Sequence, residues 1–311
     1  MKSVDELEQE IRGFINRPRT QYALLQDTAA WNLLCSCLDT IGDTELAIDA
    51  YKQSSNPSTV GATYLLVYGA LQALFVQQDA VENLCQALAI DYVRGSLLTD
   101  IREIRNDSTG HPTKRGSGKG RAYNIISRSS LTKTGFHLMT TYPDSRSPLF
   151  RQVSIESLIE GQRDILQRVL TEVLGKLKKE EADHRAKYRD QRLQDVFPST
   201  LGYYFEKIAE ATHGSKPAEF GTIHVRLIAE TIEAFKERMK QRGILGAYDS
   251  VIYLIELIEY PIQELTDYFV DTTSSHISAK GAYIFAFFIE RHIEELKGIA
   301  KEIDETYESE P

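Results

Sequence analysis

The residues best suited to chemistry in this 311-residue chain lie between Arg105 and His111, in the run Arg-Asn-Asp-Ser-Thr-Gly-His. Arg105 ends a stretch in which apolar residues recur at helical spacing. Pro112 follows the histidine and disfavours helical geometry there, and Gly110 permits a sharp bend. We therefore expect the chain to fold back and to bring the imidazole near the guanidinium.

An arginine and a histidine held together supply what is needed to cleave RNA without a metal ion. An imidazole can take the proton of a ribose 2′-hydroxyl near neutral pH, so that the hydroxyl attacks the adjacent phosphate. A guanidinium is a permanent planar cation that stabilises the charge on the phosphoryl oxygens. The alternative is structural: Arg105 caps the helix and His111 hydrogen-bonds within a turn.

Positive charge gathers in the residues that follow. Residues 108–155 contain eight basic side chains and one acid, Asp144, a net of +7 in a chain that carries −9 overall. Such segregation predicts a polyanion site, whereas the alternative is a solvated basic loop without a partner. The residues expected to hold an RNA backbone, through salt-dependent contacts that do not read sequence, are Lys114, Arg115, Lys119, Arg121 and Arg128.

Helices are expected to position this segment. The apolar pattern predicts them at about 4–17, 22–42, 45–51 and 96–105, with another from 154 that runs into a densely charged stretch at 176–192. We expect Gly42 to end one helix and Thr44 to cap the next. Residues 59–90 are apolar on most sides, which places them in the centre of the core.

The pattern changes between residues 108 and 154, which are rich in Gly, Ser, Thr and basic side chains. Residues 123–127 and 136–140 look extended around a turn at 133–135, which predicts a β-hairpin. Tyr123 or Phe136 has a ring that could stack a base, but packing of the hairpin is the favoured interpretation.

Beyond Phe197-Pro198-Ser199, helices are expected at about 199–213, 217–241, 246–270 and 277–306, the third containing Pro261. The predicted fold class is therefore all-α, with a small inserted β-hairpin and a second, C-terminal helical domain. The expected domains are 1–190, with the basic hairpin insertion at about 112–153, and 191–311.

Arg105-Asn106, four further residues and His111, at the end of a helix in an all-α context, resemble the RNx4H form of the HEPN motif. HEPN stands for higher eukaryotes and prokaryotes nucleotide-binding domains. The specific likeness covers these seven residues, and the helix pattern covers about residues 1–190. The strand pair and the helix entered at Val153-Ser154 are similar to HEPN proteins of abortive-infection type. The resemblance implies a HEPN-like helical bundle.

The resemblance also implies a metal-independent endoribonuclease that acts as a homodimer and leaves a cyclic phosphate and a 5′-hydroxyl. His111 would transfer the proton, Arg105 would hold the phosphate, and Asn106 would orient one of them or the phosphate. A toxin or antiviral defence effector acting on single-stranded or transfer RNA is expected. The candidate partner protein is an antitoxin or another member of a defence system. Related toxins often have a tyrosine where Thr113 stands, so control by tyrosine modification is not expected. The alternative is a catalytically inactive helical module that binds RNA or protein.

The composition predicts a cytoplasmic protein that does not enter a membrane. Apolar runs are interrupted well before the roughly 18–20 residues that a membrane span needs, and the N-terminus is acidic. Three cysteines are too few for a disulfide framework, and Cys35 and Cys37 would diverge on a helix, so no metal or cofactor is expected. His184 lies in a charged helix and is expected to be solvated, and the singly scattered histidines of the second domain are expected to be surface or packing residues.

Overall fold

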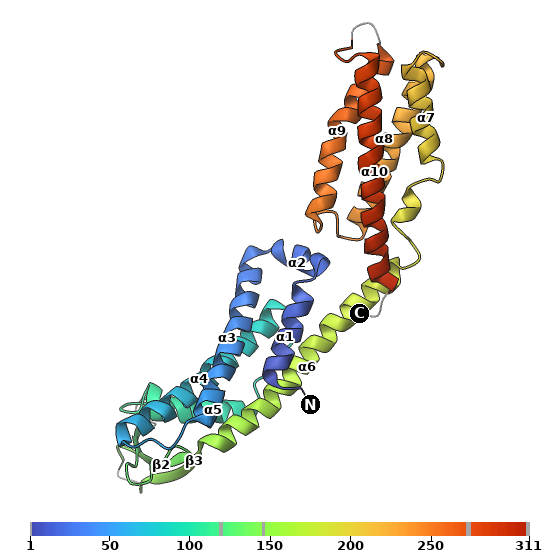
Figure 1. Cartoon of the computed structure of the whole chain (residues 1–311). Helices are drawn as coiled ribbons and strands as arrows, with labels where there is room; N and C mark the ends of the chain where they lie inside the picture. Colours follow the sequence, from blue (N-terminus) through green and yellow to red (C-terminus); the bar gives the residue numbers. More distant parts are fainter. Residues whose placement is uncertain (1, 118–120, 145–146, 272–274, 309–311) are drawn as a thin grey trace. The chain divides into compact units, whose positions relative to one another are not determined.

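The computed structural model describes the chain apart from residues 1, 118–120, 145–146, 272–274 and 309–311 (Figure 1). The fold is all-α with one small antiparallel sheet, as the sequence predicts. It divides into two compact units: Met1–Ile15 with Leu24–Leu177, and Asn16–Ala23 with Lys178–Pro311. The division falls inside a helix at Leu177 rather than near residue 190, and a short N-terminal stretch belongs to the second unit.

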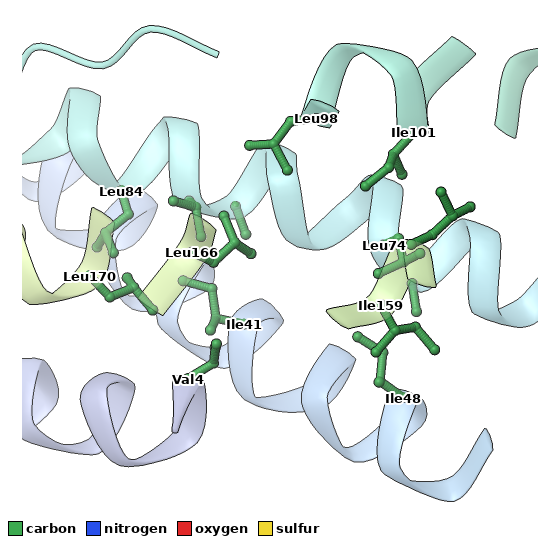
Figure 2. Packing of buried hydrophobic residues seen from close by; sticks show 14 of the residues in the cluster. Val4, Ile41, Ile48, Leu74, Leu84, Leu98, Ile101, Ile159, Leu166 and Leu170 are labelled. Atoms are coloured by element: carbon green, nitrogen blue, oxygen red, sulfur yellow. The ribbon is translucent and has the colours of Figure 1, made fainter. Parts of the chain in front are cut away.

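Five helices build the first unit around one core. They are α1 (Val4–Ile15), α3 (Thr28–Gln53), α4 (Val60–Ala87), α5 (Ser96–Arg105) and the first part of α6 (Ile155–Tyr188), while α2 (Pro18–Leu25) is shared between the units. Figure 2 shows the aliphatic side chains of these helices pointing into a common interior, among them Ile41 and Ile48 from α3, Leu74 and Leu84 from α4, Leu98 and Ile101 from α5, and Ile159 and Leu166 from α6.

The expected helix break at Gly42 is wrong, because α3 runs without interruption from Thr28 to Gln53. The Thr44 hydroxyl donates to the carbonyl oxygens of Thr40 (2.7 Å) and Ile41 (2.9 Å), so it is satisfied inside the helix and caps nothing. The cap lies earlier, at Asp27, whose carboxylate accepts from two backbone amides of the first turn.

Helix α4 is also continuous and lies in the centre of the core, as predicted. In the described part of the chain it is the one helix whose length and hydropathy would suit a membrane span. Its fully buried Gln77 and Gln78 bond to neighbouring helices instead: Gln77 donates to Glu45 of α3 (2.6 Å), and Gln78 donates to Gln162 of α6 (2.7 Å). This amide network fixes α3, α4 and α6 against one another.

The predicted hairpin is present and has a third strand. Strands β1 (Tyr123–Ile126), β2 (Gly135–Thr141) and β3 (Leu149–Ser154) form an antiparallel sheet in the order β1-β2-β3. Phe136, Leu138 and Val153 turn one face of the sheet into the core, so Phe136 packs rather than stacks. The sequence pattern missed β3 because Leu149-Phe150-Arg151-Gln152 shows no apolar alternation, and four successive residues there are exposed.

The second unit is a bundle of helices around its own core. It contains α7 (Leu201–Thr212), α8 (Ala218–Gln241), α9 (Asp249–Val270, with Pro261 inside) and α10 (Ala279–Glu308), preceded by a 3₁₀ turn at Gln194–Val196. The expectation that His184 is solvated is wrong. Its ring is half-buried, its Nε2 lies 3.0 Å from the carbonyl oxygen of Arg242, and burial lowers its pKa.

Candidate active site

The segment from Arg105 to His111 forms a π-helical turn that continues α5. The turn, η1, spans Asn106–Gly110, and the His111 amide donates to the Asn106 carbonyl at 2.7 Å, five residues back. Such turns are rare and occur frequently at functional sites. A Cβ added to Gly110 would lie 2.7 Å from Nη1 of Arg105. A glycine is therefore required if the guanidinium is to keep its place.

The Arg105 guanidinium is held by three hydrogen bonds to neutral groups. Its Nε and Nη2 donate to Oε1 of Gln72 at 3.1 and 2.8 Å, and its Nη1 donates to Oδ1 of Asn106 at 3.0 Å. Its Cζ lies 4.3 Å from the centre of the Phe75 ring, a cation–π contact. Gln72 and Phe75 both belong to α4, so a contact between two helices orients the arginine.

A second arginine on the same ring differs from Arg105 in its charge partner. Arg102, one turn earlier on α5, lies 3.8 Å from the Phe75 ring centre and forms an ion pair with Asp79 at 2.5 Å. Arg105 forms no ion pair with any residue that the structure describes. The charge of Arg102 is thus matched by a carboxylate, whereas that of Arg105 has no carboxylate partner among the described residues.

His111 follows the turn and is exposed. Its backbone leaves helical geometry, with φ −139° and ψ 49°. The imidazole makes no hydrogen bond to any described residue and none to Arg105. The structure thus brings Arg105 and Asn106 into contact, places Gly110 against the guanidinium, and leaves the ring of the next residue free to meet a ligand.

The turn is fastened to the sheet through Asp107. Its carboxylate accepts from Nδ2 of Asn124 in β1 at 3.1 Å and forms an ion pair with Arg115. The backbone amide of Asn124 also donates to the Pro112 carbonyl at 2.8 Å. The start of β1 and the candidate site are therefore one continuous structure. No local pattern predicts this bond, because Asp107 and Asn124 are 17 residues apart and meet through the folding of the insertion.

The predicted RNA-binding residues have different surroundings. Arg115 is engaged by Asp107 and Glu103, so it holds the loop in place. Lys114 and Arg128 are exposed and form no ion pair with a described residue. Arg121 is half-buried, with a buried Nε that has no hydrogen-bond partner. Lys119 lies outside the described residues.

Sequence reasoning missed Gln72 and Phe75, which precede Arg105 by 33 and 30 positions. Nothing in the pattern of α4 marks them, because an exposed glutamine and a half-buried phenylalanine are ordinary on a helix surface. Among the described residues, no group of three or more His, Cys, Asp or Glu side chains is arranged to hold a metal ion.

Known proteins supply no relative for this site. No family model, no curated protein and no solved structure matches the chain. What Arg105 and His111 do must therefore be inferred from their own contacts and exposure.

Proposed function

We propose that this protein is a metal-independent endoribonuclease of HEPN type, with Arg105, Asn106 and His111 as its catalytic residues. The observation that carries the proposal is the set of contacts around the Arg105 guanidinium. This group is fixed by neutral amide oxygens and an aromatic ring, with no carboxylate partner in the described part of the chain, and it lies at the start of a turn that ends in an exposed imidazole. A preorganised, uncompensated cation is what stabilises charge that develops on a phosphate.

The reaction is a transfer within the RNA chain. The His111 imidazole accepts the proton of a ribose 2′-hydroxyl, and the oxygen attacks the adjacent phosphorus. The bond to the 5′-oxygen breaks, and that oxygen takes a proton from the protonated His111 of a second copy of the chain, which leaves a 2′,3′-cyclic phosphate and a 5′-hydroxyl. Arg105 donates to the non-bridging oxygens, and Asn106 keeps the guanidinium aimed at them.

A second copy of the chain completes the site in this proposal, because one imidazole does not serve the attacking and the leaving oxygen at the same moment. An exposed stripe on α4 supports such a homodimer. Leu65 (74% exposed) and Tyr68 (40% exposed) are followed at helical spacing by Gln72 and Phe75, the two residues that hold Arg105. Apolar side chains exposed beside a candidate site favour contact with another protein surface.

The biological role proposed is that of a toxin or an antiviral defence effector in the cytoplasm, which cleaves single-stranded or transfer RNA. An antitoxin or another defence-system protein would keep the ribonuclease inactive. Expression of the chain should then slow growth, and His111→Ala should relieve the inhibition at equal protein level. Growth inhibition that persists in this variant would contradict the role.

The second candidate function is a catalytically inactive module that binds RNA or protein. One observation favours it: Gln72, Asn106 and Phe75 already satisfy much of the guanidinium, as they would for an arginine that only stabilises the fold. Such a module would retain RNA in a salt-dependent manner without turnover, and His111→Ala would change nothing.

The direct test is cleavage of single-stranded and transfer RNA by the purified full chain in EDTA. We expect cutting to persist without divalent metal and to fall by about 10²–10⁴ in His111→Ala. His276→Ala is the matched control, because His276 is also exposed but lies in the second unit. Loss of cutting in EDTA, or equal activity of the two variants, would rule the mechanism out.

A further inference from the structure

The face of the sheet turned away from the core carries a row of apolar side chains. Ile125, Met139 and Phe150 are paired side by side across β1, β2 and β3. Ile125 is 52% exposed and Phe150 is 69% exposed. Because side chains alternate along a strand, Ile126 and Leu138 point into the core while this row faces out. An exposed phenylalanine on the outer face of the edge strand β3 requires an explanation.

The sheet is free of acidic side chains. No carboxylate occurs in β1, β2, β3 or in the connection from Ser127 to Thr134, whereas the connection from β2 to β3 contains Asp144. The connection from Ser127 to Thr134 contains the exposed Arg128, and Arg121 lies two residues before the start of β1. In a chain whose net charge is −9, an apolar row on strands that contain no acid, with Arg121 and Arg128 nearby in the sequence, favours a polyanion over an ordinary protein surface.

The row leads away from the candidate active site. Asn124, next to Ile125, is the residue that bonds to Asp107 of the π-helical turn. At the opposite end of the sheet is a cavity rich in groups that can bond to ribose hydroxyls and base edges. Its polar lining includes Ser130, Thr132, Thr134, His137, Gln152 and Glu156. The face therefore joins a phosphate-directed site to a hydroxyl-lined cavity.

The size of the row also distinguishes between occupants. Three side chains offer far less than the roughly 800 Å² that each partner buries in a stable protein interface. They match one or two bases, and an exposed aromatic ring on a basic sheet is a common way to hold unpaired RNA.

We infer that the outer face of the sheet is a platform for single-stranded RNA, with a base stacked on Phe150 and the adjoining backbone held by Arg128. The inference rests on the proposed function for the identity of the nucleic acid, and it names the class of substrate: RNA whose bases are unpaired. In a duplex the bases are stacked on one another, so no base face is available to stack on the Phe150 ring.

The test measures binding of a labelled oligouridine to the full chain by fluorescence anisotropy at low salt, in a His111→Ala background so that the RNA stays intact. Phe150→Ala should weaken binding between about fivefold and about a hundredfold, and Phe150→Leu should behave like it because the π face is gone. Phe150→Trp should bind at least as well as the parent. Phe287→Ala is the matched control: Phe287 is 64% exposed on α10, in the second unit.

A second arm separates stacking from charge. Arg128→Ala should lower the salt dependence of log affinity by about one, whereas Phe150→Ala should leave that slope unchanged. An RNA duplex of the same length should bind more weakly than the single strand. Equal binding of duplex and single strand, or equal affinities of Phe150→Ala and Phe287→Ala, would overturn the inference.

Two further outcomes keep the inference apart from the proposed function. If Phe150→Ala changes the molar mass in light scattering while RNA affinity stays the same, the face is a protein interface and the inference fails. If the chain without the His111 substitution never cleaves RNA, yet Phe150→Ala still weakens binding, the platform stands and the nuclease proposal falls.

Discussion

Arg105 in the first unit and Arg242 in the second both form hydrogen bonds and lie against an aromatic ring. Their surroundings differ in charge, because Arg242 has a carboxylate partner and Arg105 has none among the described residues. Arg242 is 2% exposed, lies 4.7 Å from the centre of the Tyr307 ring, and forms an ion pair with Asp304 at 3.1 Å. Asp304 also accepts from the backbone amides of Leu193 and Gln194. Arg105 is half-buried, and its hydrogen bonds to described side chains go to amide oxygens.

Two histidines of the second unit differ from His111 in the same way. In the second unit, Nδ1 of His224 lies 2.6 Å from the Phe220 carbonyl, and Nδ1 of His292 lies 2.7 Å from the Phe288 carbonyl. Both rings bond within their own helix, while the ring of His111 is exposed and forms no hydrogen bond to a described residue. Groups with partners hold the fold together, whereas polar groups that are positioned but uncompensated are the candidates for chemistry.

The largest effect should come from separating the buried pair. Asp304→Ala leaves the Arg242 cation without a partner, which should cost about 3–5 kcal/mol in the free energy of unfolding. Urea denaturation of the full chain would show this as an earlier transition. The double variant Arg242→Met with Asp304→Leu should recover most of the loss, because no buried charge remains. A loss below about 1 kcal/mol in the single variant would contradict a structural role for the pair.

Removing the uncompensated cation should affect the reaction and not the fold. Arg105→Ala should lower RNA cleavage about 10²–10³-fold, with little change in urea midpoint. Arg102→Ala removes the other arginine on Phe75 and is the matched control; cleavage should change by no more than a few-fold, since Asp79 already matches that charge. Similar rates for the two variants would show that the missing carboxylate has no functional meaning.

Moving the guanidinium without removing it should have an intermediate effect. The methyl group of Gly110→Ala would lie 2.7 Å from Arg105 Nη1, so the end of this flexible side chain must shift. A displacement of about 1 Å can lower a rate by up to about 10²-fold, while stability should scarcely change. Gly175→Ala in α6 meets no atom within 4 Å and is the control for adding a methyl group to a helix. Undiminished cleavage by Gly110→Ala would mean that the position of Arg105 is not critical.

The smallest effect is a pH dependence of the second unit. Burial lowers the pKa of His184, the nearby Arg19 cation adds to this, and the buried Nδ1 has no partner. As pH falls below about 6.5, the unfolded chain binds a proton that the folded ring resists, so stability is full above that pH and declines below it. The decline should be at most about 1.4 kcal/mol per pH unit.

Urea midpoints at neutral and mildly acidic pH would measure it. His184→Gln should reduce the dependence, whereas His276→Gln should not, because His276 is exposed. A midpoint that rises on acidification would reverse the sign and contradict this description.

Local patterns predicted the elements that depend on local chemistry. The helix from Ser96 to Arg105 and the turn-rich insertion after it follow from apolar spacing and from Gly110 and Pro112. The sequence pattern wrongly predicted a helix end at Gly42 and a new cap at Thr44. There the packing of the long helix α3 outweighs the low helix propensity of these two residues. It also failed at β3, whose pairing with β2 rather than its own sequence makes it a strand.

The candidate site was predictable only in part, for the same reason. Arg105, Asn106 and His111 are marked by residue type and spacing. The π-helical turn between them, and the support from Gln72 and Phe75, depend on how α4 packs beside α5. Whether an arginine is neutralised by a neighbour is a property of the folded contacts, and sequence spacing does not give it.

The most direct test of the central claim is the chemistry of the RNA ends. The full chain would be incubated with an end-labelled single-stranded RNA in EDTA, and the fragments examined by mass spectrometry. Attack by the 2′-hydroxyl predicts a 2′,3′-cyclic phosphate on one fragment and a 5′-hydroxyl on the other, both absent with His111→Ala. Fragments with a 3′-hydroxyl and a 5′-phosphate, or intact RNA, would contradict the assignment of Arg105 and His111 as a ribonuclease site.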